Sequence, residues 1–394
     1  MERIDERIPG VDLPLMSVSQ TRGVIRRSEL TDAPHRAESL DAYKVCRKND
    51  VVFNKMSIRS GAMGVANEDG LVTYHYEVMR PRPGTDSRYV VYLMKSDWFT
   101  GELIARERGI GAGDQSNVRT TEVPFSVLRT ISAFIPGPGT QRAIADFLDR
   151  ETAQIDTLIK EQQRLIEMLR ERRFAVISQS VDKPESVVPF RRIIARIRQG
   201  SSPNCEPWGA DGVTEWAVLK VGCSNTGRFR ASENKRLPDT EEPRPDFVVQ
   251  PGEIVMSRSN SKELVGSASV VDGEYPRLML SDLTYGITLK EAAVPEYIAY
   301  ALAGGRARWS IASMSKGTSL SMQKISQRDI RELVLALPSP DEQRAIAAYL
   351  DEQTSKIDAL IAETERLIEL ARERRTALIT AAVTGRIDVR DEVP

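Results

Sequence analysis

The stretch QRAIADFLDRETAQIDTLIKEQQRLIEMLRERRFAVIS, from Gln141 to Ser178, occurs twice in the chain. The second copy, QRAIAAYLDEQTSKIDALIAETERLIELARERRTALIT, runs from Gln343 to Thr380. The two copies match without a gap at 23 of 38 positions, with a constant offset of 202 residues. A repeat at about half of the length of a 394-residue chain indicates one duplicated unit and not a solenoid.

Both copies are predicted to be long helices, because their apolar residues recur on a seven-residue frame. Each holds an acidic and hydroxyl-rich turn, 149–152 or 351–354, which suits a helix start or a helix junction. The apolar stripes are expected to cover each other as an intramolecular helix pair. The stripe residues expected at this contact are Ile155, Leu158, Leu165, Leu169, Ile357, Leu360, Leu367 and Leu378.

Polar residues interrupt the stripes at Gln162 and Thr364, which either fix the register of the pair or lie at a solvated helix edge. An arginine pair follows in each copy, at 172–173 and 374–375. These arginines are expected to form ion clusters with glutamates of the same stretches, in preference to a binding site. The glutamates concerned are Glu167, Glu171, Glu369 and Glu373.

Length and composition favour a globular, cytoplasmic protein of two or three domains, since 41% of the residues are hydrophobic. The formal charge is -1, so a nucleic-acid partner would have to meet local basic patches. Cys46, Cys205 and Cys223 are too few and too scattered for a disulfide framework or a CxxC metal site. The chain has no 18-residue apolar run and no signal-peptide core, so neither a membrane nor an export role is expected.

The division expected from these patterns is a first domain at 1–140, a first long helix at 141–180, a second domain at 181–342, a second long helix at 343–381 and a tail at 382–394. Both domains are expected to be mixed α/β. In the first, short strand-like or apolar segments are expected at 13–19, 51–56, 72–81 and 89–94, a helix at 98–109, a polar loop at 111–118 and a strand at 127–139.

The second domain repeats this order but begins with a basic segment at 190–202 for which the first domain has no long counterpart. Either the N-terminus is trimmed, or another segment completes the first domain. The tail at 382–394 is the candidate, because antiparallel helices would return the end of the chain to the first domain.

Catalytic and metal-binding patterns are missing from the sequence. Two histidines, His35 and His75, cannot build a His-rich metal centre, and no phosphate-binding GxxxxGK[ST] loop occurs. The nearest nuclease-like string includes Asp246 and Glu253, but Val255 stands where such enzymes keep a lysine. Glu253 is therefore interpreted as a turn residue, and no catalytic or metal-ligating residue is expected.

Several segments instead combine Lys or Arg with hydroxyl and amide side chains, the groups that contact phosphates and base edges of DNA. Each segment alone fits a solvated loop, but they recur at matching places in both halves. The candidates for DNA binding in the first half are Lys55, Arg59, Ser60 and Asn117. Those in the second half are Lys220, Arg258, Asn260, Lys262, Thr318, Ser319, Gln323 and Lys324.

The pattern resembles the specificity subunit of type I restriction-modification systems, the HsdS family. The resemblance covers nearly the whole chain and is most specific at PSPDEQRAIAAYLDEQTSKIDALI (338–361) and ERRTALITAAVTGRID (373–388). The first copy has the same motif, with Gly139 and Thr140 in place of Asp and Glu. The resemblance implies two α/β target recognition domains joined by two long antiparallel coiled-coil helices, with a pseudo-twofold internal duplication.

The resemblance also implies partners. Double-stranded DNA would be read as two unlike blocks, methyltransferase subunits with S-adenosylmethionine would dock on the helices, and motor-nuclease subunits using ATP and Mg²⁺ would join for cleavage. The chain itself would bind no cofactor. About 26 helical residues span roughly 39 Å, close to one DNA turn of about 34–36 Å, so the helices could set the spacing.

Two alternatives remain from the sequence. A coiled-coil scaffold with protein-binding lobes would explain the helices but not the repeated basic loops. An autonomous nuclease or methyltransferase with fused recognition domains is opposed by the missing motifs.

Overall fold

The computed structural model describes residues 1–32, 39–107, 123–182, 187–317 and 322–389. It divides into two compact units: unit 1 comprises Met1–Gln163 and Glu365–Pro394, and unit 2 comprises Arg164–Thr364. Over the ranges given, no helix is both long and apolar enough to cross a membrane.

Each unit is built on a four-stranded antiparallel sheet, and the two sheets have the same strand order. In unit 1 the order is β1 (Glu2–Ile4), β8 (Tyr76–Arg80), β5 (Val51–Asn54) and β6 (Met63–Val65). In unit 2 it is β10 (Ile194–Gln199), β17 (Thr284–Leu289), β13 (Ile254–Ser257) and β15 (Ala268–Val270). The duplication therefore includes the sheets. The basic segment of the second half has a short counterpart in the first half, as expected: the three-residue β1 takes the place of the six-residue β10.

Smaller sheets surround these cores. In unit 1, β2 (Met16–Ser19) pairs with β3 (Gly23–Arg26), and β4 (Lys44–Cys46) pairs with β7 (Gly70–Val72). In unit 2, β11 (Ala217–Leu219) lies between β12 (Asn234–Arg236) and β16 (Leu278–Met279). Two further pairs in unit 2 are β14 (Ser259–Asn260) with β18 (Gln323–Lys324), and β9 (Val187–Pro189) with β19 (Val334–Ala336).

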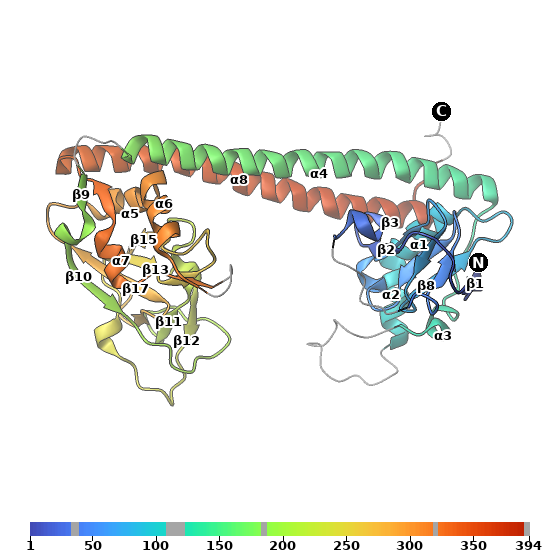
Figure 1. Ribbon diagram of the computed structural model, residues 1–394, viewed down its shortest axis with the longest axis horizontal. Helices are drawn as coiled ribbons and strands as arrows, with labels where there is room; N and C mark the ends of the chain where they lie inside the picture. The colour runs from blue at the N-terminus through green and yellow to red at the C-terminus, as the bar shows by residue number, and fades with distance from the viewer. Residues whose placement is uncertain (33–38, 108–122, 183–186, 318–321, 390–394) are drawn as a thin grey trace. The chain divides into compact units, whose positions relative to one another are not determined.

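Two successive helices pack beside each main sheet (Figure 1). They are α1 (Ser87–Lys95) and α2 (Asp97–Glu107) in unit 1, and α5 (Pro295–Ala303) and α6 (Gly305–Met314) in unit 2. The segment at 89–94, expected as strand-like or apolar, is a buried part of helix α1, which the Asp86 side chain caps by accepting the backbone N–H groups of Arg88 and Tyr89. The strand expected at 127–139 is wrong, since α3 (Phe125–Leu128) precedes an irregular segment there. The short helix α7 (Gln327–Glu332) completes unit 2.

The two long helices predicted from the repeat are confirmed as α4 (Pro138–Val181) and α8 (Pro340–Val383). Both run unbroken through the acidic turns that were interpreted as a start or junction. Those turns instead tie the helix to its unit. The Tyr92 hydroxyl donates to Asp149 at 2.7 Å, and the Tyr300 hydroxyl donates to the equivalent Asp351 at 2.7 Å.

The glutamine that opens each repeat anchors the start of its helix. Gln141 accepts the Asp86 backbone N–H at 3.0 Å and donates to the Pro136 carbonyl at 2.8 Å. Gln343 is equivalent: it accepts the Val294 N–H at 2.8 Å and donates to the Pro338 carbonyl at 2.8 Å. Both side chains are buried, so these bonds fix where each helix leaves its domain.

Within each unit, one half of α4 runs antiparallel to one half of α8, and an ion pair joins them. Arg375 donates to Asp156 at 2.9 Å in unit 1, and Arg173 donates to Asp358 at 2.9 Å in unit 2. The offset of 202 residues relates both members of these pairs. The ion clusters expected with neighbouring glutamates are therefore corrected for Arg173 and Arg375, whose partners are aspartates of the facing helix.

The buried stripe differs in part from the expected one. Ile155, Leu169 and Ile357 are buried as expected, and Leu378 is half-buried. Leu158, Leu165, Leu360 and Leu367 are exposed instead, by 38, 37, 50 and 42%. Ile166 and Thr364 of unit 2, and Ile368 and Ala371 of unit 1, are also buried, although they are not in the expected set.

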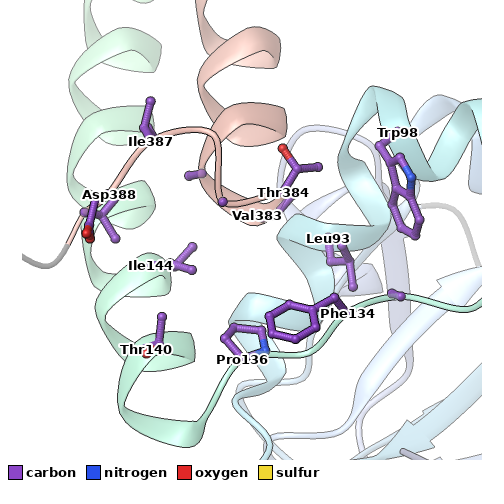
Figure 2. A pocket seen from close by; sticks show the side chains of 14 residues that line it. Leu93, Trp98, Phe134, Pro136, Thr140, Ile144, Val383, Thr384, Ile387 and Asp388 are labelled. Carbon is purple, nitrogen blue, oxygen red and sulfur yellow. The ribbon is translucent and has the colours of Figure 1, made fainter.

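The C-terminal segment packs into the core of unit 1. Val383 and Val389 are buried in the same cluster as Tyr89, Leu93 and Leu148. Gly385, with φ of +72°, ends α8 in the left-handed conformation that favours glycine. The segment then borders a cavity of about 560 Å³, and Leu93, Ile144 and Val383 are among the residues that line it (Figure 2). The tail, which was the candidate to complete the first half, thus contributes to the core of unit 1 as far as residue 389.

Candidate nucleic-acid interface

The β14–β18 pair brings together two segments that the sequence analysis selected independently. Ser259 lies opposite Lys324, and Asn260 lies opposite Gln323. The Asn260 side-chain amide donates to the Asn225 side-chain oxygen at 2.9 Å, while its own oxygen accepts the Ser261 backbone N–H at 2.9 Å. Two amide side chains thus stand side by side on a two-stranded ribbon, one of the shapes that enters the major groove of DNA.

Arg258 immediately precedes this ribbon, and its side chain is partly fixed. Its Nη1 donates to the Asp282 carbonyl at 3.1 Å, and its backbone N–H donates to the Leu283 carbonyl at 2.8 Å. Beside it the Tyr285 hydroxyl donates to the Ile325 carbonyl at 3.2 Å. Burial raises the pKa of Tyr285, so the phenol stays protonated.

A cavity of about 840 Å³ adjoins the ribbon. Arg258, Tyr285 and Lys324 line it, together with two cations that were not among the predicted residues, Lys316 and Arg328. Lys316 lies two residues before the candidate Thr318 in the sequence. Arg328 lies on α7, four residues after Lys324 of β18.

The remaining candidates of unit 2 lie apart from this group or outside the described residues. Lys262 is exposed two residues after β14, and Lys220 is half-buried at the start of the turn at 221–224. Thr318 and Ser319 fall outside the residues that the structure describes.

In unit 1, Lys55 follows β5 as Arg258 follows β13. Its ammonium group lies 3.7 Å from the Glu77 carboxylate. Arg59 and Ser60 lie in the next turn, at 58–60, where Ser60 accepts a hydrogen bond from the Gln20 amide at 2.9 Å. Asn117 is outside the described residues. Lys55, Arg59 and Ser60 are thus close in the chain, but Lys55 is partly neutralised within the protein.

Glu77 holds three cations. It accepts two hydrogen bonds from Arg3, at 2.7 and 2.9 Å, and one from Lys44 at 3.2 Å, besides its contact with Lys55. Burial alone would raise the pKa of the Glu77 carboxyl, but the Arg3 hydrogen bonds and the Lys44 charge outweigh burial and hold the pKa below its ordinary value. Glu77 is the register partner of Phe53 in β5, and Tyr285 is the register partner of the equivalent Met256 in β13. Glu77 and Tyr285 therefore occupy equivalent positions, where unit 1 has a carboxylate and unit 2 a phenol.

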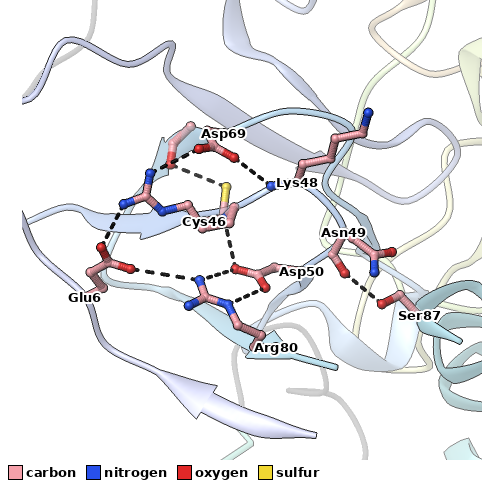
Figure 3. A network of polar contacts seen from close by, with 10 residues as sticks. Glu6, Cys46, Lys48, Asn49, Asp50, Asp69, Arg80 and Ser87 are labelled. Atoms are coloured by element: carbon pink, nitrogen blue, oxygen red, sulfur yellow. Dashed lines mark hydrogen bonds and ion pairs between the residues drawn. The ribbon is translucent and has the colours of Figure 1, made fainter. Parts of the chain in front are cut away.

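Each unit has a buried carboxylate just before its equivalent strand, Asp50 before β5 and Glu253 before β13. Asp50 accepts two hydrogen bonds from Arg80, at 2.9 and 3.0 Å, within the network drawn in Figure 3. Glu253 accepts the Arg198 guanidinium at 2.5 and 2.7 Å. Glu253 is a turn residue, as interpreted from the sequence, since its backbone N–H donates to the Gln250 carbonyl at 3.0 Å, and its side chain is in addition buried in an ion pair. A side chain at Gly286 would collide with it.

The Asp50–Arg80 pair joins the residue before β5 to the adjacent strand β8, and the Glu253–Arg198 pair joins the residue before β13 to β10, on the far side of β17. Both are structural uses of the carboxylates. In the part of the chain that the structure describes, no group of three or more His, Cys, Asp or Glu side chains is arranged to hold a metal ion.

Comparison with known proteins gives sequence relatives of one kind. No family model matches the chain. The EcoEI type I restriction enzyme specificity subunit of Escherichia coli is 28% identical over 192 residues, 48% of this chain and 32% of that protein. The EcoKI specificity subunit of E. coli K12 is 22% identical over 328 residues, 79% of this chain and 68% of that protein. The first match thus spans about a third of its relative's length.

Solved structures agree on the fold. A chain from a structural study of type I restriction-modification complex assembly superposes with a TM-score of 0.66 at 16% identity, covering 98% of this chain and 95% of that one. The HsdS subunit of Thermoanaerobacter tengcongensis gives a TM-score of 0.50 at 16% identity, covering 98% and 94%.

The fold therefore defines the class of proteins in which two α/β recognition domains are joined by two long helices. Within that class, the chain is related to the specificity subunits of type I restriction-modification systems, the HsdS family.

Proposed function

We propose that this chain is the DNA-reading subunit of a type I restriction-modification complex, that it recognises a bipartite asymmetric target and that it performs no chemistry itself. The observation that supports this most is the pair of units with one sheet topology and different loop chemistry. A shared scaffold bearing different side chains would present two unlike surfaces to two unlike DNA blocks.

Domain 181–342 would read one block and domain 1–140 the other. In the former, Asn260 and Gln323 would contact base edges, while Lys220, Arg258, Lys262 and Lys324 would contribute charge toward DNA. In domain 1–140, Lys55 and Arg59 would contribute charge, and the Ser60 hydroxyl would form hydrogen bonds to DNA. The residues Asn117, Thr318 and Ser319 belong to the same proposal. Phosphate contacts by Lys and Arg would supply affinity, and base contacts would supply selectivity.

The exposed apolar residues of the long helices support docking of two copies of one partner. Leu158, Leu367 and Leu370 are exposed in unit 1, and their equivalents at an offset of 202, Leu360, Leu165 and Met168, are exposed in unit 2. Each unit thus carries the same set. Methyltransferase subunits, with S-adenosylmethionine, would bind these surfaces, and motor-nuclease subunits would supply ATP and Mg²⁺ chemistry.

The test is to co-express the chain with the methyltransferase subunit encoded beside it and to map methylated adenines across the host genome. One motif with two unlike blocks and an unread spacer is expected. A stable complex that methylates no defined motif would refute the DNA-reading role. Methylation or Mg²⁺-dependent cleavage by the chain alone would instead support the autonomous enzyme.

A further inference from the structure

Four cations meet at the 840 Å³ cavity of unit 2: Arg258, Lys316, Lys324 and Arg328. They come from different parts of the fold. Arg258 stands at the end of β13, and Arg328 is on α7, while Lys316 and Lys324 are held together by a pair of backbone hydrogen bonds of 2.9 Å. Their placement therefore depends on the tertiary fold and not on a run of basic sequence.

None of these four cations forms an ion pair with a carboxylate among the residues that the structure describes. Two carboxylates also line the cavity, so its cations outnumber its carboxylates by four to two. Asp329 accepts the Ser326 hydroxyl at 2.6 Å and its backbone N–H at 3.1 Å, and Glu332 pairs with Arg191 at 2.8 Å. The cavity is thus a concave surface with an excess of positive charge, in a chain whose formal charge is -1.

We infer that this cavity grips the phosphodiester backbone of DNA beside the bases that the β14–β18 ribbon reads. The inference rests on the proposed function and assigns base contacts to the ribbon and phosphate contacts to the cavity. The ribbon presents Asn260 and Gln323, whose amides match the donor and acceptor pattern of a base edge. The adjoining cavity presents two lysines and two arginines, which bind phosphates as charges without reading sequence.

Arg258 belongs to the backbone grip in this assignment. One of its nitrogens is committed to the Asp282 carbonyl, which holds the guanidinium at the cavity wall. Gln199, Tyr285 and Ser326 add neutral polar groups around the same space. Lys55, the unit 1 equivalent of Arg258, is not available for phosphate in the same way, because Glu77 stands in place of Tyr285 and its carboxylate lies 3.7 Å from the Lys55 ammonium group. The grip is therefore a property of unit 2.

The test measures binding by the co-expressed methyltransferase complex to two duplexes, one with the methylated motif and one with the second block scrambled, over a range of KCl concentrations. Arg328→Ala and Lys324→Ala are each expected to lower affinity about fivefold at 0.15 M salt, equally on both duplexes. Each should also reduce the slope of log affinity against log salt by about 0.9. Arg258→Lys should keep most of the affinity, since it keeps the charge.

Lys290→Ala is the matched control, because Lys290 is an exposed lysine of the same unit at the opposite end of β17 from Tyr285. It should leave the slope unchanged. Losses confined to the cognate duplex, or no loss with Arg328→Ala and Lys324→Ala, would overturn the backbone assignment. If the wild-type complex binds both duplexes equally, the proposed function fails, while the salt slopes still decide whether the cavity holds phosphates.

Discussion

Glu77 is the residue on which the electrostatics of unit 1 depend most. Its side chain is 1% exposed, and the Lys44 side chain beside it is 3% exposed. Removing the carboxylate would leave a buried ammonium group without its counterion, which typically costs several kcal/mol. The arrangement stabilises the fold but also reduces the charge that Lys55 can offer to DNA.

Glu77→Gln is therefore expected to lower the free energy of unfolding of unit 1 by about 3–5 kcal/mol. Urea denaturation followed by far-UV circular dichroism would measure this loss. Glu68→Gln is the control, because the Arg26–Glu68 pair is exposed on both sides and should contribute less than about 1 kcal/mol. Equal effects of the two substitutions would contradict the role assigned to Glu77.

The same carboxylate predicts a pH dependence. Its pKa in the folded protein lies below the ordinary value of 4.5, so the stabilisation is present above pH 4.5 and disappears as the pH falls through the folded-state pKa. Melting temperatures of wild type and Glu77→Gln should therefore converge as the pH is lowered from 7 to 3. A gap that stays constant over this range would argue against ionisation of Glu77 as the source.

At the scale of the element, each long helix is tied to its unit by one tyrosine. Tyr92 contacts Asp149 at 2.7 Å and Thr152 at 3.2 Å, and Tyr300 contacts Asp351 at 2.7 Å and Thr354 at 3.0 Å. The ties are equivalent, so their energetic contributions should be similar.

Tyr92→Phe and Tyr300→Phe are each expected to cost about 1 kcal/mol of unfolding free energy. Their effects should be additive, because they lie in different units and share no partner. Tyr349→Phe, at a tyrosine that is 51% exposed, is the control and should be neutral. Chemical denaturation of the two single variants and the double variant would reveal any coupling between the units.

The elements also show which features sequence patterns can predict. The long helices were predictable, because their apolar residues keep a seven-residue frame over more than three helical turns and the frame occurs twice in the chain. The segment at 89–94 was not, because a short apolar run suits a strand or a buried helix equally until the cap at Asp86 is seen. Leu158 and Leu360 were predicted to be buried at the helix contact but are exposed, because a helix with extra apolar residues allows more than one apolar stripe.

The candidate interface was predictable to a similar degree. The segments around Asn260 and Gln323 could be selected from composition, but their pairing as β14 and β18 depends on tertiary contacts. Arg328 carries no local signal, and the neutralisation of Lys55 by Glu77 joins residues 22 positions apart through sheet register.

At the scale of the whole molecule, two separate cores underlie the two units, and the end of the chain belongs to the first. Val389 is 3% exposed in the cluster of unit 1, whereas the core of unit 2 contains no residue of that segment among those described. Substitutions in the C-terminal segment should therefore lower the stability of unit 1 and not that of unit 2.

Val389→Asp is expected to destabilise unit 1 by more than about 2 kcal/mol, since it loses apolar burial and places a carboxylate in the core. Limited proteolysis should then cleave unit 1 first and leave a fragment of unit 2. Arg386→Ala, at a position outside the buried cluster, is the control. Simultaneous loss of both units would show that they do not unfold independently.

The separation of the two cores has a consequence for inheritance. A mutation in a loop of one unit does not disturb the packing of the other, so selection can alter each half of the proposed target independently. A population holding several alleles of each half can then reach as many specificities as there are pairings between them. New targets become available by reassortment, without a new fold.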